Sequence, residues 1–199
     1  LLRELRDAGR TVIVVHHDET LERCTDGIGR LADHDWDTIS RLDAGHTWTG
    51  DGGETFPFRG RDVRIPTLEA VFEAFPDLRI NIELKAPGFE QAFADLIRRL
   101  DVVDRVCVGA EEDDIAARLR AVMPESCHYI PRDALTAFEM AQKTGAPAPE
   151  FAPEMTVLDM PATWQGMQLV DPPFLEFAAE HGLWVNVWTI DDAPTMRAL

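Results

Sequence analysis

Short apolar runs alternate along this chain with longer segments whose apolar residues recur at helical spacing. The first run, residues 11–15, is β-branched throughout, and a short run of this kind predicts a buried strand. Further on, Leu68, Val71 and Phe75 fall on one face of a helix that starts after a Pro-Thr pair, and Pro76 ends it. The two patterns together indicate a chain that mixes strands and helices.

The same alternation continues to the end of the sequence and predicts βα units around a parallel sheet. We expect strands at residues 78–85, 105–109, 127–130, 156–160 and 184–189. We expect helices at residues 89–100, 115–122, 134–143 and 172–182, and a terminal helix capped by residues 191–192. Residues 25–65 break the pattern with Gly, Asp, Thr and scattered aromatic residues, which predicts a loop-rich insertion with one short helix near residues 35–42.

Two architectures fit this order of elements, an open doubly wound sheet and a (β/α)8 barrel. No Gly-rich phosphate fingerprint follows any expected strand, which argues against a nucleotide-binding open sheet. Polar or aromatic side chains instead end three expected strands: residues 16–18, Glu83 with Lys85, and Trp188. Because barrel enzymes place their chemistry at the carboxyl ends of the strands, we predict a barrel.

Residues two apart in a strand share a face, so Asn81, Glu83 and Lys85 are expected to point together into the barrel. A carboxylate beside an ammonium there is either a structural ion pair or a functional pair, and residue types do not decide between these. His17 can pass a proton near neutral pH, although strand alternation does not show whether it points inward. Trp188 fits either core packing or a wall for a small polyol, and Trp184 is expected to pack in the core.

The charge and the cysteines restrict the function further. The formal net charge of −17 makes nucleic-acid binding improbable, because a polyanion is repelled. The three cysteines, Cys24, Cys107 and Cys127, are distant in sequence and show no metal-binding spacing. Reduced structural thiols are expected, which favours a cytoplasmic location over a periplasmic or secreted one. No apolar run approaches the ~18 residues of a transmembrane segment, and nothing indicates an oligomeric state.

Four motifs in register resemble the glycerophosphodiester phosphodiesterase family. VHHDETLERCTDG at residues 15–27 is similar to that family's HD-x-x-L-x-R-x-T-x-G stretch, with Cys24 where Thr is common. IPTLE at residues 65–69, NIELK at residues 81–85 and VWTID at residues 187–191 resemble three further family motifs in the same order. The resemblance extends over nearly the whole chain.

This resemblance implies a (β/α)8 TIM barrel of the phospholipase-C-like phosphodiesterase type, with an insertion after the HD motif. His17 would be one of two histidines that act as general acid and base, and Glu83 would bind a divalent cation, Ca²⁺ or Mg²⁺. Lys85 would neutralise the phosphate, and Trp188 would line the glycerol side. The implied reaction hydrolyses a glycerophosphodiester to glycerol 3-phosphate and an alcohol.

No His-Arg-Gly motif occurs in the sequence, no Glu-x-Asp motif precedes the HD stretch, and the final strand of the family is not found after Leu199. We therefore expect residues 1–199 to form a partial domain that lacks the first and last strands. Such a barrel has open edges, so the chain alone is expected to be inactive or poorly folded. Full-rate, metal-dependent hydrolysis of glycerophosphocholine by this chain would contradict that expectation.

Two alternatives stay open. The first is a relative in the same superfamily that cleaves intact lipids, as phospholipases do. The second is a non-catalytic binding module that keeps the barrel without the metal.

Overall fold

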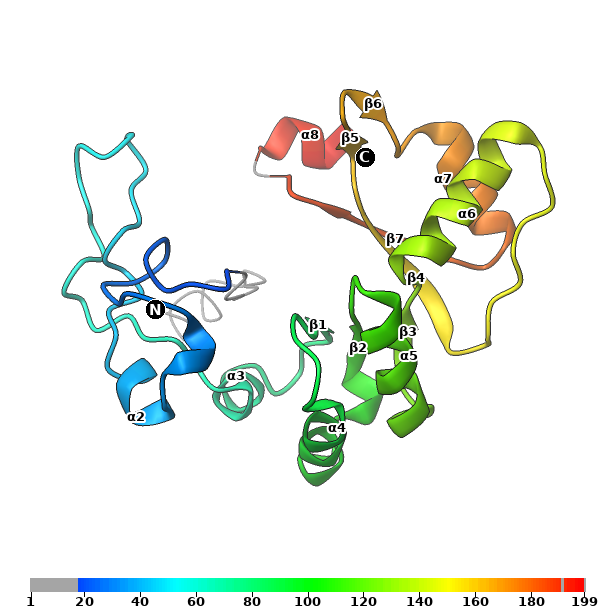
Figure 1. Cartoon of the computed structure of the whole chain (residues 1–199). Coiled ribbons are helices and arrows are strands. Elements are labelled where there is room, and N and C mark those ends of the chain that lie inside the picture. The colour runs from blue at the N-terminus through cyan, green and yellow to red at the C-terminus, as the bar shows by residue number, and fades with distance from the viewer. Residues whose placement is uncertain (1–17, 191, 199) are drawn as a thin grey trace. The chain divides into compact units, whose positions relative to one another are not determined.

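The structure, a computed structural model, describes residues 18–190 and 192–198 (Figure 1). Clustering of the backbone divides the chain into two compact units, residues 1–78 and residues 79–199. The strand expected at residues 11–15 lies outside the described residues, as does His17.

The first unit contains few regular elements between long loops. Asp35 caps the short helix that starts at Trp36, because its carboxylate accepts a hydrogen bond from the Thr38 amide at 2.9 Å. Thr67 caps the next helix in the same way, through the Ala70 amide at 3.1 Å. Both caps satisfy amides that would otherwise lack a partner at a helix start. The elements are η1 (Leu31–Asp33), α2 (Trp36–Ile39) and α3 (Leu68–Ala74).

The loops of this unit are held by their own side chains. The Asp43 carboxylate accepts hydrogen bonds from the amides of Gly60, at 2.8 Å, and Gly45, at 2.9 Å. These bonds favour the charged form and lower the pKa of Asp43. The rings of Trp48 and Phe58 pack with centroids 4.8 Å apart. Residues 25–65 are therefore an ordered loop segment that polar and aromatic contacts stabilise.

The second unit is built on a five-stranded parallel sheet in which every strand pairs with the next parallel strand along the chain. In a doubly wound sheet, successive strands are added first on one side of the starting strand and then on the other, and the change occurs at a switch point. In this sheet each successive parallel strand is added on the same side. That order, with helices between the strands, is the order of a barrel wall. The strands are β1 (Ile80–Glu83), β2 (Val106–Gly109), β3 (Cys127–Tyr129), β4 (Met155–Pro161) and β7 (Trp184–Trp188).

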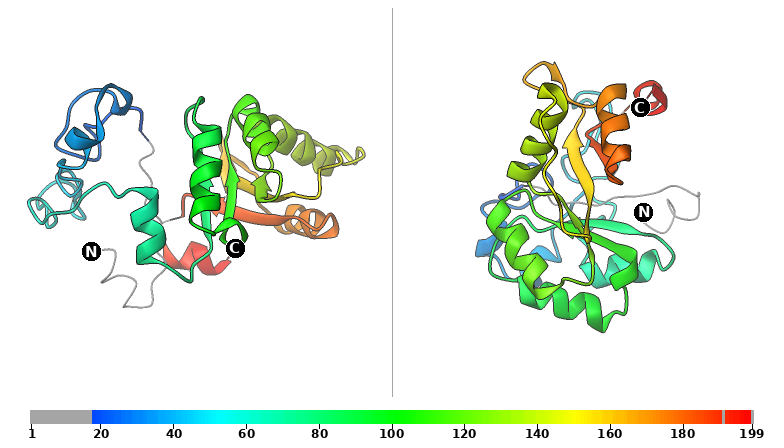
Figure 2. Two further views of the ribbon diagram at one scale, coloured as in Figure 1. Left: turned by 90° about the horizontal axis from the view of Figure 1, so that it is seen from below. Right: turned by 90° about the vertical axis from the view of Figure 1, so that its right-hand side faces the viewer.

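Helices cover one face of this sheet, as the views in Figure 2 show. Phe138 and Phe174, from the two helices that flank β4 in sequence, are fully buried against Leu158 and Met160. We call this side the outer face of the sheet. The helical elements of this unit are α4 (Glu90–Arg99), η2 (Val103–Arg105), α5 (Asp113–Val122), α6 (Arg132–Thr144), α7 (Pro172–Glu180) and α8 (Ala193–Ala198).

The opposite side of the sheet, the inner face, carries a different set of side chains. Cys107, Cys127, Tyr129 and Val157 form a separate buried cluster there. Asp159 belongs to the same face, because it lies two residues after Val157 in β4 and opposite Asn186 of β7. The inner face is therefore apolar near its base and polar toward the carboxyl ends of the strands.

A short antiparallel hairpin between β4 and α7 was not expected from the sequence. Its strands are β5 (Thr163–Trp164) and β6 (Met167–Gln168). The two residues between them have positive φ, 48° at Gln165 and 80° at Gly166, which is the backbone of a tight two-residue hairpin turn. Strands of two exposed residues are too short to show a period, so the sequence pattern does not reveal them.

Candidate functional site

Two strands of the second unit end in polar or aromatic side chains at one edge of the sheet, and a third carries a carboxylate close to that edge. Glu83 ends β1 and lies opposite Gly109 of β2, while Trp188 ends β7 and lies opposite Pro161 of β4. Asp159 precedes this edge by two residues in β4. Because the strands are parallel, their carboxyl ends meet at this edge, as the sequence predicted for Glu83 and Trp188.

Glu83 and Lys85 form an ion pair, with 2.7 Å between Glu83 Oε2 and Lys85 Nζ. Their side chains are 26% and 32% exposed, so both groups remain reachable from solvent. Leu84, between them, is buried on the other side of the strand. The alternation expected for this strand is thus observed, and a half-exposed pair of this kind contributes little stability. The pair is placed where a ligand can contact both groups.

Asp159 is a site residue that our sequence reasoning missed. Burial raises the pKa of this carboxyl, while hydrogen bonds from the side chains of Asn186 and Trp188 oppose the rise. The negative charge of Glu83 raises the pKa further and the positive charge of Lys85 lowers it. Asp159 therefore lies within electrostatic reach of both predicted residues. A lone carboxylate in an otherwise apolar strand was the signal that could have identified it.

Tyr129 and Gly109 form the base of this polar group. A Cβ atom added at Gly109 would overlap the ring and the Cβ atom of Tyr129, so the close approach of β2 and β3 here requires glycine. Burial raises the pKa of the Tyr129 hydroxyl, and the charges of Asp159 and Glu83 act in the same direction. Tyr129 is consequently a neutral phenol beneath two carboxylates.

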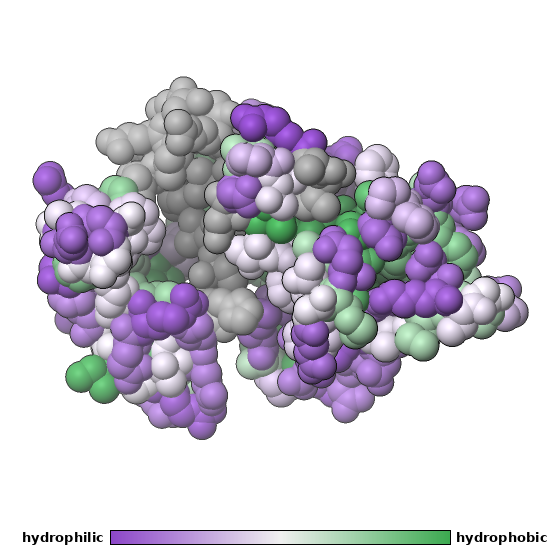
Figure 3. All heavy atoms as spheres, turned by 90° about the horizontal axis from the view of Figure 1, so that it is seen from above, coloured by the Kyte–Doolittle hydropathy of each residue, from purple (hydrophilic) through white to green (hydrophobic). Residues whose placement is uncertain are grey.

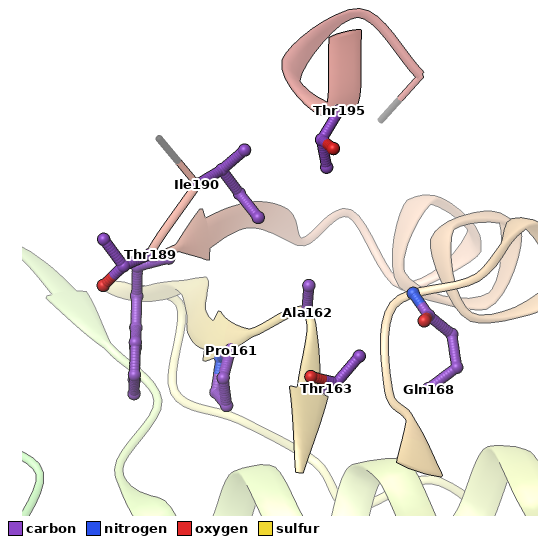
Figure 4. Close-up of a pocket in the computed structure, with 8 residues that line it drawn as sticks. Pro161, Ala162, Thr163, Gln168, Thr189, Ile190 and Thr195 are labelled. Atoms are coloured by element: carbon purple, nitrogen blue, oxygen red, sulfur yellow. The ribbon is translucent and has the colours of Figure 1, made fainter. Parts of the chain in front are cut away.

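Trp188 borders a hollow of about 390 Å³ at the carboxyl ends of β4 and β7 (Figure 4). The hairpin β5–β6 supplies Thr163 and Gln168 to its wall, and α8 supplies Thr195. Figure 4 shows these side chains around the space beyond Pro161 and Ala162. Hydroxyl and amide groups beside a Trp ring 46% exposed suit a small polar molecule. The prediction that Trp184 packs in the core is wrong, because its side chain is 76% exposed. Trp184 begins β7, and β7 has a single neighbouring strand in the described sheet.

A second hollow, of about 610 Å³, lies at the opposite edge of the sheet. Met155 at the start of β4 and Leu183 just before β7 line it, with the loop at residues 148–153. In parallel barrels this edge serves stability, whereas ligands bind beyond the carboxyl ends of the strands. The hollow beside Trp188 is therefore the candidate site.

The HD part of the predicted site is only partly described. His17 lies outside the described residues, so its predicted role stays a prediction. Asp18 is described: its carboxylate pairs with the Arg23 guanidinium, with 2.8 Å between Asp18 Oδ1 and Arg23 Nη2. Cys24 Sγ also lies 3.8 Å from that carboxylate.

The carboxylate oxygens at the sheet edge are the kind of ligand that a hard divalent cation prefers, although there are fewer of them than such a cation needs. Glu83 and Asp159 are two carboxylates near the carboxyl ends of β1 and β4, and Ca²⁺ takes six to eight oxygen ligands. Among residues 18–190 and 192–198, no group of three or more candidate ligands is close enough to bind a metal by itself. A cation at Glu83 would need further oxygen ligands from elsewhere, such as water or a substrate phosphate.

Comparison with known proteins supplies the family. Residues 11–199 match the glycerophosphoryl diester phosphodiesterase family. The chain belongs to this family. A probable glycerophosphodiester phosphodiesterase 2 of Mycobacterium tuberculosis is 25% identical over 201 residues, which cover 100% of this chain and 69% of that protein. The family membership confirms the predicted class, a phosphoric diester hydrolase, and its members generally depend on a divalent cation.

Two solved structures show the same fold. The glycerophosphoryl diester phosphodiesterase domain of an uncharacterized M. tuberculosis protein superposes with a TM-score of 0.73 and 21% identity, covering 85% of this chain and 69% of that one. A phosphodiesterase of Oleispira antarctica, solved with the product sn-glycerol-3-phosphate, has a TM-score of 0.60 and 19% identity, covering 93% of this chain and 71% of that one. The curled parallel sheet is thus part of a (β/α)8 barrel, as predicted.

Proposed function

We propose that the site at the carboxyl ends of β1, β4 and β7 hydrolyses glycerophosphodiesters to glycerol 3-phosphate and an alcohol. The observation that carries the proposal is the meeting of Glu83, Lys85 and Asp159 at one edge of the sheet, beside Trp188 and its hollow. The family membership supports this chemistry, and the product complex of the O. antarctica relative supports the substrate class.

Lys85 binds the phosphate in this proposal. Its ammonium, 32% exposed and 2.7 Å from Glu83, is the positive charge that lies closest to both carboxylates of the inner face. The chain carries a formal charge of −17, so a phosphodiester meets a repulsive field except where a local cation offsets it. An ammonium held in place stabilises the charge that develops on the phosphoryl oxygens.

Glu83 would hold the divalent cation, Ca²⁺ or Mg²⁺, and Asp159 is a second carboxylate within electrostatic reach of Glu83. When bound, the cation polarises a phosphoryl oxygen. Burial raises the pKa of the Asp159 carboxyl, and its oxygens can accept a hydrogen bond from a substrate hydroxyl. The amide of Asn186 fixes the orientation of Asp159.

Trp188 and the hydroxyl groups of the adjoining hollow position the glycerol moiety. An indole face packs against the carbon skeleton of a polyol, and the hydroxyl groups of Thr163 and Thr195 exchange hydrogen bonds with its oxygens. His17 is one of two histidines that act as general acid and base on the leaving and attacking oxygens in this proposal. This assignment of His17 follows the HD motif in the sequence.

The lysine pair of this chain allows a matched test. Lys85 and Lys143 are its two lysines, and each pairs with a glutamate, Lys143 with Glu139 at 2.5 Å on the surface of α6. Lys85→Met should weaken binding of sn-glycerol 3-phosphate at least about tenfold and lower hydrolysis of glycerophosphocholine about 100-fold, since one positioned charge is lost. Lys143→Met should leave both unchanged.

Calorimetry with sn-glycerol 3-phosphate measures binding even when turnover is slow, as we expect for this chain alone, and ³¹P NMR follows hydrolysis. Glu83→Gln should abolish the enhancement of binding by Ca²⁺ or Mg²⁺, whereas the control Glu139→Gln should keep it. Equal affinity of Lys85→Met and Lys143→Met for the product would refute the proposed phosphate site.

A further inference from the structure

Two of the three cysteines, 20 residues apart in sequence, touch on the inner face of the sheet. Cys107 of β2 and Cys127 of β3 are direct partners in the parallel register. Their Sγ atoms lie 2.6 Å apart, and a hydrogen bond links the thiols. From the sequence we expected separate, reduced thiols. Only the pairing of β2 with β3 brings the two cysteines together.

The spacing of the two strands allows these cysteines to form a disulfide without large movement of the backbone. Paired strands lie about 4.8 Å apart, within the Cα separation of roughly 4.4–6.8 Å that disulfides take. Both side chains point to the same face, since each contributes to the same buried cluster with Tyr129 and Val157. Both cysteines are free in the structure.

The surroundings of the two thiols have opposite effects on how readily each one forms a thiolate. Hydrogen bonding with Cys107 and with the Thr156 hydroxyl, 3.3 Å away, lowers the pKa of Cys127. The same hydrogen bond, together with burial and the charge of Asp159, raises the pKa of Cys107. Cys127 is also the more exposed of the two, Cys107 being 9% exposed.

We infer that Cys107 and Cys127 form a redox-sensitive thiol pair, which closes to a disulfide when a small peroxide reaches the inner face. The Cys127 thiolate attacks one peroxide oxygen and the O–O bond breaks; the other oxygen leaves with the bonding electrons and takes up a proton from water, and Cys127 becomes a sulfenic acid. The Cys107 sulfur then attacks the Cys127 sulfur, the S–O bond breaks and water leaves. The two thiols lose two electrons in total, and the peroxide gains them.

Cys24 lies in the other compact unit, so its removal isolates the pair. In Cys24→Ser, hydrogen peroxide should remove both remaining thiols together, and the mass should fall by two hydrogens. Peptide mapping should join Cys107 to Cys127, and dithiothreitol should restore both thiols. Disulfide formation in the folded chain should be at least about tenfold faster than in urea, because the fold holds the two sulfurs in contact.

Two further variants separate the roles of the sulfurs. In Cys24→Ser/Cys107→Ala, dimedone should trap a sulfenic acid on Cys127. In Cys24→Ser/Cys127→Ala, Cys107 should react at least about tenfold more slowly, since its thiolate is disfavoured. Circular dichroism checks that each variant folds; where one does not, the comparison of folded and urea-unfolded Cys24→Ser decides alone. The inference is overturned if the folded pair resists peroxide or closes no faster than in urea.

Discussion

At the scale of single residues, the burial and the contacts of each strand side chain depend on which face of the strand it occupies. Glu83 and Lys85 were predictable because a polar pair two residues apart marks one face of β1. Asp159 was not predicted, although it shares their surroundings, because its partners Asn186 and Trp188 belong to another strand. Residue types show that a group is unusual, and contacts across strands show what it does.

His128 is predicted to make the chain sensitive to acid. Its ring is buried, with Nε2 2.8 Å from the Met123 carbonyl oxygen, and burial lowers its pKa. Below the unfolded-state pKa of about 6.5, the unfolded chain binds a proton that the folded chain resists. Stability is therefore lost as the pH falls through that value toward the folded-state pKa, by up to about 1.4 kcal/mol per pH unit.

Chemical denaturation between pH 7 and pH 5 measures this effect. His128→Gln keeps an amide donor for the Met123 carbonyl and cannot take up a proton, so its free energy of unfolding should vary less with pH. His181→Gln is the control, since His181 is exposed and bonds Phe177 within its own helix end. Identical pH slopes for wild type and His128→Gln would contradict the prediction.

Gly109→Ala is predicted to be strongly destabilising through sterics. The added Cβ would overlap Tyr129 in the neighbouring strand, and overpacking of this kind costs about 1–3 kcal/mol or more. Gly145→Ala is the matched control: Gly145 ends α6 at φ 72° with open space around it, so the cost is about 1 kcal/mol from backbone strain alone. Urea unfolding of the two variants should rank them in that order, and the reverse rank would show that Tyr129 moves freely.

At the scale of elements, the spacing of apolar residues predicted most of the helices and strands of the described residues. Apolar residues of α6 and α7 recur at helical spacing because those faces pack on the outer face of the sheet. The hairpin β5–β6 is the exception, and it contributes Thr163 and Gln168 to the hollow beside Trp188. Its turn is local, but its strands are too short to carry a pattern.

The packing of α6 against α7 provides a prediction at this scale. Phe138 is fully buried, and its ring lies 4.8 Å from Phe177 and 6.1 Å from Phe174 between centroids. Phe138→Ala should lower the free energy of unfolding by about 3–5 kcal/mol, because a large cavity opens. Met140→Ala, on the same helix but 52% exposed, should cost under about 1 kcal/mol. Similar losses in the two variants would show that this cluster is not tightly packed.

At the scale of the whole molecule, the acidic composition and the order of the strands dominate. Among the coloured residues in Figure 3, hydrophilic ones are widespread and hydrophobic ones form smaller areas between them. In the described part of the chain, no helix is long and apolar enough to cross a membrane. The strand order grows in one direction, so the carboxyl ends of successive strands follow one another along a single edge. That edge carries the candidate site.

The net charge of −17 predicts that salt stabilises the fold. Self-repulsion opposes compaction, and raising NaCl from about 0.01 M to about 0.1 M shortens the screening length from about 30 Å to about 10 Å. The thermal midpoint should therefore rise over this range by a few degrees and then level off. KCl should act equally if screening is the cause. Differential scanning fluorimetry measures this, and a midpoint that falls with salt would refute the prediction.

The sequence by itself determined most helices and strands of the described residues, the acidic composition and the family, because each of these depends on local periodicity, composition or motifs. It also placed Glu83, Lys85 and Trp188 at strand ends. Only the tertiary structure decided that Asp159 joins them, that Cys107 touches Cys127, and that Trp184 is exposed on the end strand. The physical reason is that these outcomes depend on the register between strands, which is set by contacts between residues far apart in the chain.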